Sequence, residues 1–322
     1  MPIVVPRRAL LGLAASAAAS AALGESVEPA DPTEIAPLWP GPPPGAPERL
    51  PHELIVDRAP TSGFRDRYVT GIGTPLLTVF RPAHPNGAAA LIAPGGGYIR
   101  VVIDKEGFEI ARRLALVGVT SFVLYRLPGE GWTRRADVST QDAQRALRLI
   151  RAGAGRFGID PVRVAVIGCS AGGHVAASLS TRFAEPLYAA RDDADRLSAR
   201  PDLACLLYPV IEMSRPYAHV GSRTALLGES PTPQDEQAAT PWRRVSAQTP
   251  PSFLVHALDD RSVPPENSLN HLAALRRAGV PAEAHLFQEG GHGFGIRLIQ
   301  GRPAAAWPDL FLAWAARHGW GP

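Results

Sequence analysis

The sequence predicts an α/β fold in which helices cover both faces of a mostly parallel sheet. Short apolar or β-branched runs alternate along the chain with stretches whose apolar residues recur at helical spacing. Hydrophobic residues make up 45% of the 322 residues, which is enough for one large core or two small ones. No internal repeat interrupts the alternation, so the main body is expected to form a single domain.

Expected strands and helices follow one another along the chain from residue 76 onward. Apolar runs expected as strands lie at residues 76–81, 88–93, 120–125, 162–167, 203–208, 252–257 and 284–287. Helical spacing is found at residues 106–117, 140–151, 267–278 and 304–317. Residues 184–202 and 211–250 break this rhythm, and we expect them on the rim of the sheet, where loops carry specificity.

The first 24 residues are typical of a secretory signal. Arg7 and Arg8 precede an uncharged Ala/Leu stretch, and small residues stand at positions 22 and 24. The arginine pair resembles a twin-arginine signal. An uncleaved anchor is the alternative, but the apolar stretch is shorter than the ~20 residues of a spanning helix. We therefore expect residues 1–24 to be removed, 25–60 to form a Pro-rich lead-in and 61–322 to form the functional domain, exported to the periplasm or beyond without stable membrane insertion.

Composition excludes several classes of protein. The net charge is only +3 and no dense basic run occurs, so a nucleic-acid partner is not expected. Two cysteines, Cys169 and Cys205, cannot form a disulfide scaffold or a Cys-rich metal site. No His-Glu-x-x-His, P-loop or Gly-x-Gly-x-x-Gly motif is present, so we expect no metal and no cofactor. Lys105 is the only lysine, and the other basic residues are scattered arginines.

The segment Gly168-Cys169-Ser170-Ala171-Gly172 matches Gly-x-Ser-x-Gly. The pentapeptide alone is a weak signal, but it follows an expected strand and opens a stretch of small residues, 171–179, that favours a helix. A nucleophile elbow needs this strand–turn–helix context, because its glycines permit a sharp turn that lifts the serine above the strand ends. A serine also needs a base, and the base needs an orienting acid.

Candidates for those partners follow the last two strands. His292 lies among glycines after the last strand, which suits a base on a loop. Asp259 and Asp260 follow the strand before it, and the order Ser, Asp, His is the one that this architecture uses. The glycines of the segment 94–98 allow a close backbone approach, so the N–H groups of Gly96, Gly97 and Ala171 are candidates for an oxyanion hole.

These motifs resemble those of the α/β-hydrolase superfamily, and within it the esterases that include acetylxylan and feruloyl esterases. The resemblance covers roughly residues 70–317 and rests on segments 94–98, 142–151, 168–174, 208–210, 256–268 and 290–295. It implies an eight-stranded sheet, a Ser/Asp/His triad and ester substrates, often acetylated hemicellulose. Pro94 stands where the hormone-sensitive-lipase group has histidine, which points away from that group. In the matched pattern the acid stands four residues after His256, which selects Asp260 over Asp259.

The expected function is therefore an exported serine esterase whose substrate is a small-molecule or carbohydrate ester, with acetylated hemicellulose favoured. A general short-chain carboxylesterase, a feruloyl esterase and a non-catalytic binding protein are the alternatives. Tyr98, Trp132 and Glu212 are candidate substrate-binding residues on the rim. His174 and His256 are expected to be packing or hydrogen-bonded residues, and Cys169 to be a small buried filler. The sequence indicates no oligomeric state.

Overall fold

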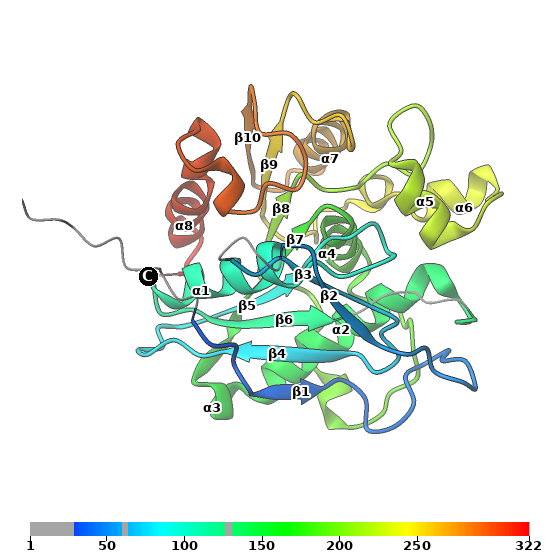
Figure 1. The fold of residues 1–322 in the computed structure, drawn as a ribbon, viewed down its shortest axis with the longest axis vertical. Helices are drawn as coiled ribbons and strands as arrows, with labels where there is room; N and C mark the ends of the chain where they lie inside the picture. Colours follow the sequence, from blue (N-terminus) through cyan, green and yellow to red (C-terminus); the bar gives the residue numbers. More distant parts are fainter. Residues whose placement is uncertain (1–28, 60–63, 126–130, 322) are drawn as a thin grey trace, which may run out of the picture.

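The computed structural model describes residues 29–59, 64–125 and 131–321, and its centre is a mixed sheet of eight strands (Figure 1). The strand order is β1-β4-β6-β5-β7-β8-β9-β10. From β6 to β10 all neighbours run parallel, whereas β4 is antiparallel to both β6 and β1. The strands span β1 (Ile35–Pro37), β4 (Leu76–Phe80), β5 (Gly87–Ala93), β6 (Thr120–Tyr125), β7 (Ile159–Cys169), β8 (Leu203–Leu207), β9 (Ser252–Ala257) and β10 (Ala282–Phe287).

Helices cover the two faces of this sheet. The α-helices are α1 (Glu109–Ala115), α2 (Arg135–Ala152), α3 (Ala154–Phe157), α4 (Ala171–Arg182), α5 (Val220–Leu227), α6 (Pro233–Ala238), α7 (Glu266–Arg277) and α8 (Trp307–Arg317). The 3-10 turns are η2 (Asp193–Arg196), η3 (Pro241–Arg244), η4 (Arg297–Ile299) and η5 (Pro303–Ala306). Helices α2, α4 and α7 pack on one face, and α1 and α8 pack on the other.

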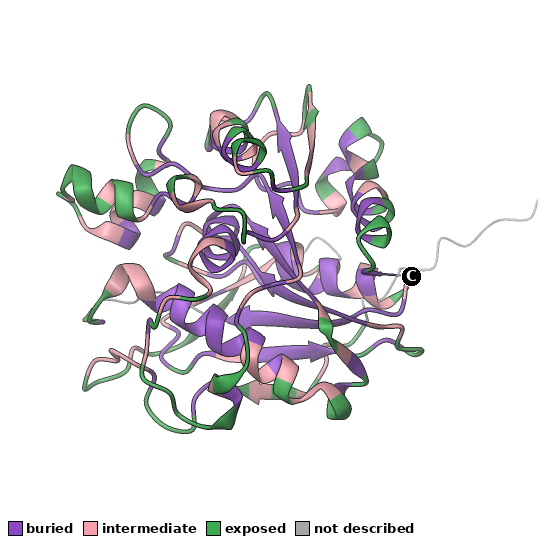
Figure 2. Ribbon diagram, turned by 180° about the vertical axis from the view of Figure 1, so that it is seen from behind, coloured by how far each residue is buried: buried purple, intermediate pink, exposed green. Residues whose placement is uncertain are grey.

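The side chains of β5 contribute to the apolar core on both faces of the sheet. Ala89 and Leu91 face the layer that contains α2 and α4, whereas Ala90 and Ile92 face the layer that contains α1 and α8. All four side chains are fully buried, as Figure 2 shows for the central strands as a group. A strand buried on both faces reads as a continuous apolar run, which is why the sequence pattern identified it. The predicted α/β architecture is confirmed.

Several elements differ from the expected ranges. Strand β7 begins at Ile159, so Asp160 and Pro161 lie inside it. The helix expected at 106–117 starts with a π-helical turn, η1 (Asp104–Phe108), and continues as α1. Gly107 lies in this turn, where a Cβ atom would approach the Val123 side chain to 2.9 Å. Tight packing against β6 therefore accompanies the irregular start.

The Pro-rich lead-in contributes structure along one side of the sheet. It supplies β1 at the sheet edge and β2 (Leu54–Asp57), which pairs with β3 (Arg67–Thr70) in a separate two-stranded sheet. Trp39 is buried, and its indole N–H donates a 2.6 Å hydrogen bond to Asp142 on α2. The expected signal at 1–24 lies outside the described residues.

Candidate active site

Ser170 lies at the turn between β7 and α4, in a backbone conformation that few residues adopt. Its φ is 54° and its ψ is −120°. The flanking glycines are sterically required: a Cβ on Gly172 would lie 1.9 Å from the carbonyl oxygen of Ala93, and one on Gly168 would lie 2.3 Å from that of Gly172. The turn thus has the strained geometry of a nucleophile elbow and carries the serine at the ends of the parallel strands.

Three side chains from separate loops form a hydrogen-bonded chain. The hydroxyl of Ser170 lies 2.8 Å from Nε2 of His292, and Nδ1 of His292 lies 2.7 Å from Oδ2 of Asp260. His292 is carried by the loop after β10, and Asp260 by the loop after β9. The neighbouring Asp259 points elsewhere and accepts a 2.8 Å hydrogen bond from the backbone N–H of Gly291. The structure therefore brings Asp260 to the histidine and uses Asp259 to hold the loop.

The surroundings of Asp260 keep its carboxylate charged and oriented. Burial by itself would raise the pKa of Asp260, but hydrogen bonds from His256 and His292 and the charge of His292 lower it well below its usual range. The other oxygen accepts 2.9 Å hydrogen bonds from the backbone N–H groups of Ser262 and Val263. His256 is fully buried and also contacts Ser268 and the Val263 carbonyl, which is the structural position expected for it.

A cavity of about 420 Å³ opens in front of Ser170. Gly96 and Gly97 line it together with His292. Both glycines have positive φ, at 134° and 67°, and a Cβ on Gly96 would lie 2.2 Å from the carbonyl oxygen of Arg100. Ala171 is the first residue of α4, where a helix leaves its N–H without an intrahelical partner. Two of the three oxyanion candidates, Gly96 and Gly97, therefore line the cavity with Ser170, and the third, Ala171, follows the serine in the chain.

The three residues expected to bind substrate do not line this cavity. Tyr98, Trp132 and Glu212 are all buried, with 6% of each exposed. The hydroxyl of Tyr98 lies 2.6 Å from Nδ1 of His174, whose Nε2 lies 2.6 Å from the Ala239 carbonyl. Because a carbonyl only accepts, Nε2 carries the proton and Nδ1 accepts from the tyrosine. Tyr98 and His174 therefore form a buried hydrogen-bonded pair that links the glycine loop, α4 and the carbonyl of Ala239.

Glu212 is likewise a buried residue whose carboxylate accepts hydrogen bonds within the protein. Its carboxylate accepts hydrogen bonds from the backbone N–H groups of Met213 and Ser214, at 3.1 and 3.0 Å, and from the indole of Trp242, at 3.0 Å. A sequence pattern does not distinguish a buried polar anchor in an irregular segment from an exposed contact residue. The placement of all three candidates on an accessible rim was therefore wrong.

Two polar residues to which the sequence motifs assigned no role in the site, Glu106 and Tyr208, lie close to Ser170. Glu106, in η1, accepts a 2.9 Å hydrogen bond from the N–H of Gly95 and a 3.2 Å hydrogen bond from the hydroxyl of Tyr208. That hydroxyl accepts in turn from the N–H of Gly295, at 3.1 Å. The glycine loop after β5 and the loop of His292 are thus linked through one buried carboxylate. The charged run 104–106, which follows the glycine-rich turn after a short apolar stretch, was the available signal.

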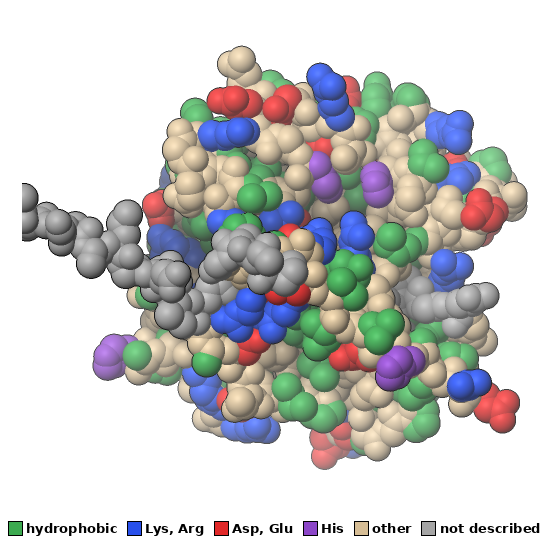
Figure 3. Space-filling view, in the orientation of Figure 1, with side chains coloured by type: hydrophobic (Ala, Val, Ile, Leu, Met, Phe, Trp, Pro, Cys, Tyr) green, Lys and Arg blue, Asp and Glu red, His purple; other side chains and the backbone are tan. Residues whose placement is uncertain are grey.

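His219 is the second histidine of the cavity and begins α5. Its Nδ1 accepts a 3.1 Å hydrogen bond from the backbone N–H of Ser222, so the ring proton is on Nε2. Burial and the nearby charge of His292 lower the pKa of His219. A neutral imidazole with one available donor therefore lines the same cavity as His292. Figure 3 shows histidines and basic side chains around the hollow near the middle of this face.

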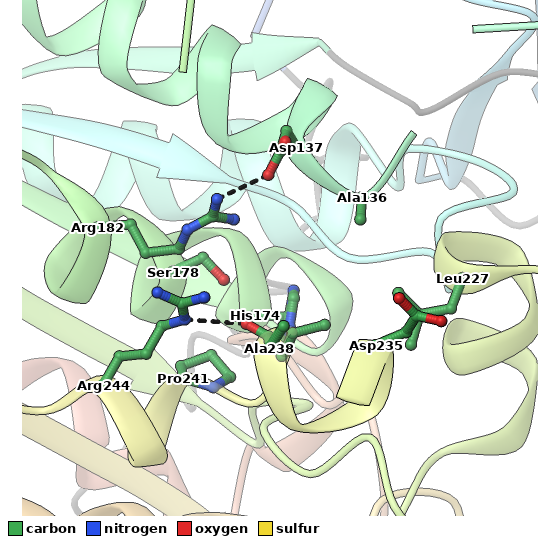
Figure 4. Close-up of a pocket in the computed structure, with 11 residues that line it drawn as sticks. Ala136, Asp137, His174, Ser178, Arg182, Leu227, Asp235, Ala238, Pro241 and Arg244 are labelled. Atoms are coloured by element: carbon green, nitrogen blue, oxygen red, sulfur yellow. Dashed lines mark hydrogen bonds and ion pairs between the residues drawn. The ribbon is translucent and has the colours of Figure 1, made fainter. Parts of the chain in front are cut away.

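A smaller cavity of about 110 Å³ lies between α2, α4 and α6, behind the wall that contains His174 (Figure 4). Its charged side chains are already engaged. Arg182 pairs with Asp137 at 2.7 Å, and Arg244 donates to the Ala238 carbonyl at 2.9 Å. Ser170 does not line this cavity, so we regard it as structural.

Within ranges 29–59, 64–125 and 131–321, no group of three or more His, Cys, Asp or Glu side chains could hold a metal ion. Over the same part of the chain, every helix is too short or too polar to cross a bilayer. Cys169 and Cys205 are buried, unpaired thiols.

Comparison with known proteins identifies the family. The profile of the family described as BD-FAE matches residues 113–275. The chain belongs to the BD-FAE family. The acetylxylan esterase of Xylanibacter ruminicola is 31% identical over 229 residues, which is 70% of this chain and 44% of the relative. Endo-1,4-beta-xylanase B of Butyrivibrio fibrisolvens is 34% identical over 64% of this chain and 32% of the relative. This BD-FAE chain thus spans less than half the length of these two curated relatives.

Solved structures agree with this assignment. The acetyl ester-xyloside bifunctional hydrolase of Caldicellulosiruptor lactoaceticus has a TM-score of 0.72 and 33% identity, with 90% of this chain and 97% of that chain covered. The carboxylesterase Cest-2923 of Lactobacillus plantarum shares the fold, with a TM-score of 0.61. These solved structures show that the BD-FAE chain has the α/β-hydrolase fold, and both of them are named as hydrolases of esters.

Proposed function

We propose that this protein is an exported serine esterase that removes acetyl groups from hemicellulose-type carbohydrates. The observation that carries the proposal is the chain of hydrogen bonds from Ser170 through His292 to Asp260, at the mouth of a cavity lined by Gly96 and Gly97. The names of relatives, acetylxylan esterase and acetyl ester-xyloside hydrolase, support the acetyl and carbohydrate parts. The signal-like residues 1–24 support export.

The proposed reaction proceeds through an acyl-enzyme. His292 takes the hydroxyl proton of Ser170 as the serine oxygen attacks the ester carbonyl carbon. Asp260 holds the imidazole in the tautomer whose Nε2 can accept that proton. Backbone N–H groups of Gly96, Gly97 and Ala171 stabilise the oxyanion, a contribution typically worth ~3–4 kcal/mol for one strong donor.

The tetrahedral intermediate then collapses as the bond to the alcohol oxygen breaks, and His292 returns its proton to that oxygen. The alcohol leaves, and the acetyl group remains on Ser170. Water, deprotonated by His292, attacks the acyl-enzyme, and acetate is released as the serine regains its proton. No further reactant is needed.

Two substrates and one variant test this function. The protein is incubated with acetylated xylan and with 4-nitrophenyl acetate, and the release of acetate and nitrophenolate is followed. We expect turnover of both, lost by several orders of magnitude in Ser170→Ala. Activity on the small ester alone would replace the carbohydrate substrate with a general short-chain carboxylesterase function. Near wild-type turnover in Ser170→Ala would refute the proposed serine mechanism. N-terminal sequencing of the exported protein would test whether residues 1–24 are removed as a signal.

A further inference from the structure

Two basic side chains of the catalytic cavity have no anionic partner in the described part of the chain. Lys105, the only lysine, and Arg100 both line the cavity with Ser170. Neither forms an ion pair with a described residue, whereas the third cation of the lining, Arg58, pairs with Asp66 at 2.6 Å. Most arginines elsewhere in this structure bind a carboxylate or a backbone carbonyl. Other described arginines, such as Arg276 and Arg317, also lack such a partner, but Lys105 and Arg100 differ from them because both line the cavity that contains Ser170.

Arg100 is held in place without being neutralised. Its guanidinium carbon lies 5.2 Å from the centre of the Tyr68 ring, and its Nε is buried with no hydrogen-bond acceptor. A stacked guanidinium keeps its remaining donors for a planar anion such as a carboxylate. The position of Arg100 follows from the glycine loop, because the Arg100 backbone packs directly against Gly96.

The cavity contains one carboxylate of its own, Glu106, and the hydrogen bonds to that group are already made. Its two oxygens accept from the N–H of Gly95 and the hydroxyl of Tyr208. No ion pair joins it to Lys105 among the described contacts. A cluster of unpaired cations around a concave surface raises the local concentration of anions and favours an anionic group in the bound substrate.

The position of Lys105 indicates which end of the substrate carries that group. Its Nζ lies 3.6 Å from the point where a Cβ of Gly293 would stand, directly beside the loop of His292. His292 must protonate the leaving alcohol oxygen, so the alcohol portion of an ester lies on the His292 side. Lys105 is therefore next to the alcohol portion.

We propose that the preferred substrate is an acetylated carbohydrate whose sugar portion carries a carboxylate, that is, an acetylated uronic acid residue held by Lys105 and Arg100. This inference rests on the proposed esterase function and specifies its substrate class. His219 supplies a neutral donor, Nε2–H, for a sugar hydroxyl in the same cavity. Lys105 and Arg100 act as specificity-determining residues and take no part in bond making.

The test compares matched esters that differ only in charge. The values of kcat/KM are measured for an O-acetylated methyl glucuronoside and for its neutral counterpart, the same compound with the uronate as its methyl ester; acetate release is followed. We expect the intact protein to prefer the carboxylate form by at least about tenfold, and we expect high salt to reduce that preference. In Lys105→Met the preference should fall below about twofold, and Lys105→Arg should retain most of it.

The matched control is Arg196→Met. Its side chain is 84% exposed on η2, and Asp193 is its one ion-pair partner among the described residues, so its loss removes one positive charge at a position that does not line the cavity. The preference should survive in this variant. If Arg196→Met and Lys105→Met lowered it equally, a general field effect would replace the proposal.

An additional pair of substrates separates the two ends of the ester. Mono-4-nitrophenyl succinate carries its carboxylate on the acyl side, and 4-nitrophenyl butyrate is neutral. A preference for the succinate with none for the glucuronoside would overturn the proposal. Turnover of 4-nitrophenyl acetate with no preference in either pair would also overturn it but leave the esterase function intact. Failure to hydrolyse any of these esters would instead refute the proposed function itself.

Discussion

Lowering the pH should destabilise this protein through two buried histidines, His174 on α4 and His271 on α7. Both are nearly inaccessible to solvent. Burial lowers the pKa of each from 6.5 to about 4. At pH values between the two pKa values, each histidine is protonated in the unfolded chain and neutral in the folded chain. The free energy of unfolding therefore falls as the pH falls from about 6.5 to about 4.

The expected magnitude follows from the size of the pKa change. For a histidine with a pKa of 6.5 in the unfolded chain and about 4 in the folded one, lowering the pH from about 7.5 to about 4.5 removes roughly 2.5 kcal/mol of unfolding free energy. The two residues together should cost about 5 kcal/mol, which is a large part of the stability of an ordinary domain.

The two histidines can be told apart by their hydrogen bonds. His174 has two partners, the hydroxyl of Tyr98 and the carbonyl of Ala239. Neither ring nitrogen of His271 has a partner among the described residues. His271→Leu should therefore be tolerated at neutral pH, or stabilise by about 1 kcal/mol, because it removes unsatisfied polar atoms. His174→Leu should destabilise at neutral pH, because it leaves the tyrosine hydroxyl unpaired.

Urea denaturation followed by tryptophan fluorescence at a series of pH values measures these differences. Relative to the intact protein, His271→Leu should gain about 2.5 kcal/mol between neutral pH and about pH 4.5. His174→Leu should show the same gain, starting from a lower stability. Curves for the intact protein and both variants that run parallel across this range would refute the reasoning, because burial would then not be the source of the pH dependence.

The other predictions concern the elbow and its acid. Asp260→Asn should lower kcat on 4-nitrophenyl acetate by roughly 10⁴, because the amide favours the wrong tautomer of His292; Asp259→Asn keeps an oxygen for the loop N–H and should stay within about threefold. The reverse ranking would show that the other carboxylate is the acid. Gly172→Ala should prevent accumulation of folded protein, since its Cβ would lie 1.9 Å from the Ala93 oxygen; a soluble variant with an unchanged Tm would contradict this.

Much of this fold could be predicted from the sequence because its signals are local. The buried strands are continuous apolar runs, and the elbow must contain glycines around Ser170 whatever else changes. The choice of Asp260 over Asp259 depended on the resemblance, and the 2.7 Å contact with His292 gives it a geometric basis.

The features that escaped prediction depend on contacts between distant segments. Strand β1 has three residues and no periodicity of its own, so only its pairing with β4 makes it a strand. From the sequence, Tyr98 is an aromatic residue beside a glycine loop and is expected to be accessible. Its burial depends on a hydrogen bond to His174, which lies 76 residues further along the chain. Lys105 stands out in the sequence as the only lysine, but its place in the cavity depends on the π-helical turn that carries it and on the packing of the His292 loop.

Strand β1 has a consequence for the solubility of the molecule. A sheet edge with free N–H and C=O groups is a template on which a second chain can pair and aggregate. Strand β4 would present such an edge, with the apolar residues Leu77 and Val79 along it. β1 occupies that edge and is itself a poor template, being three residues long and ending at Pro37, which has no N–H to donate. The Pro-rich lead-in therefore protects this edge from self-association, and a chain shortened to begin after Trp39 should aggregate even with Ser170, Asp260 and His292 intact.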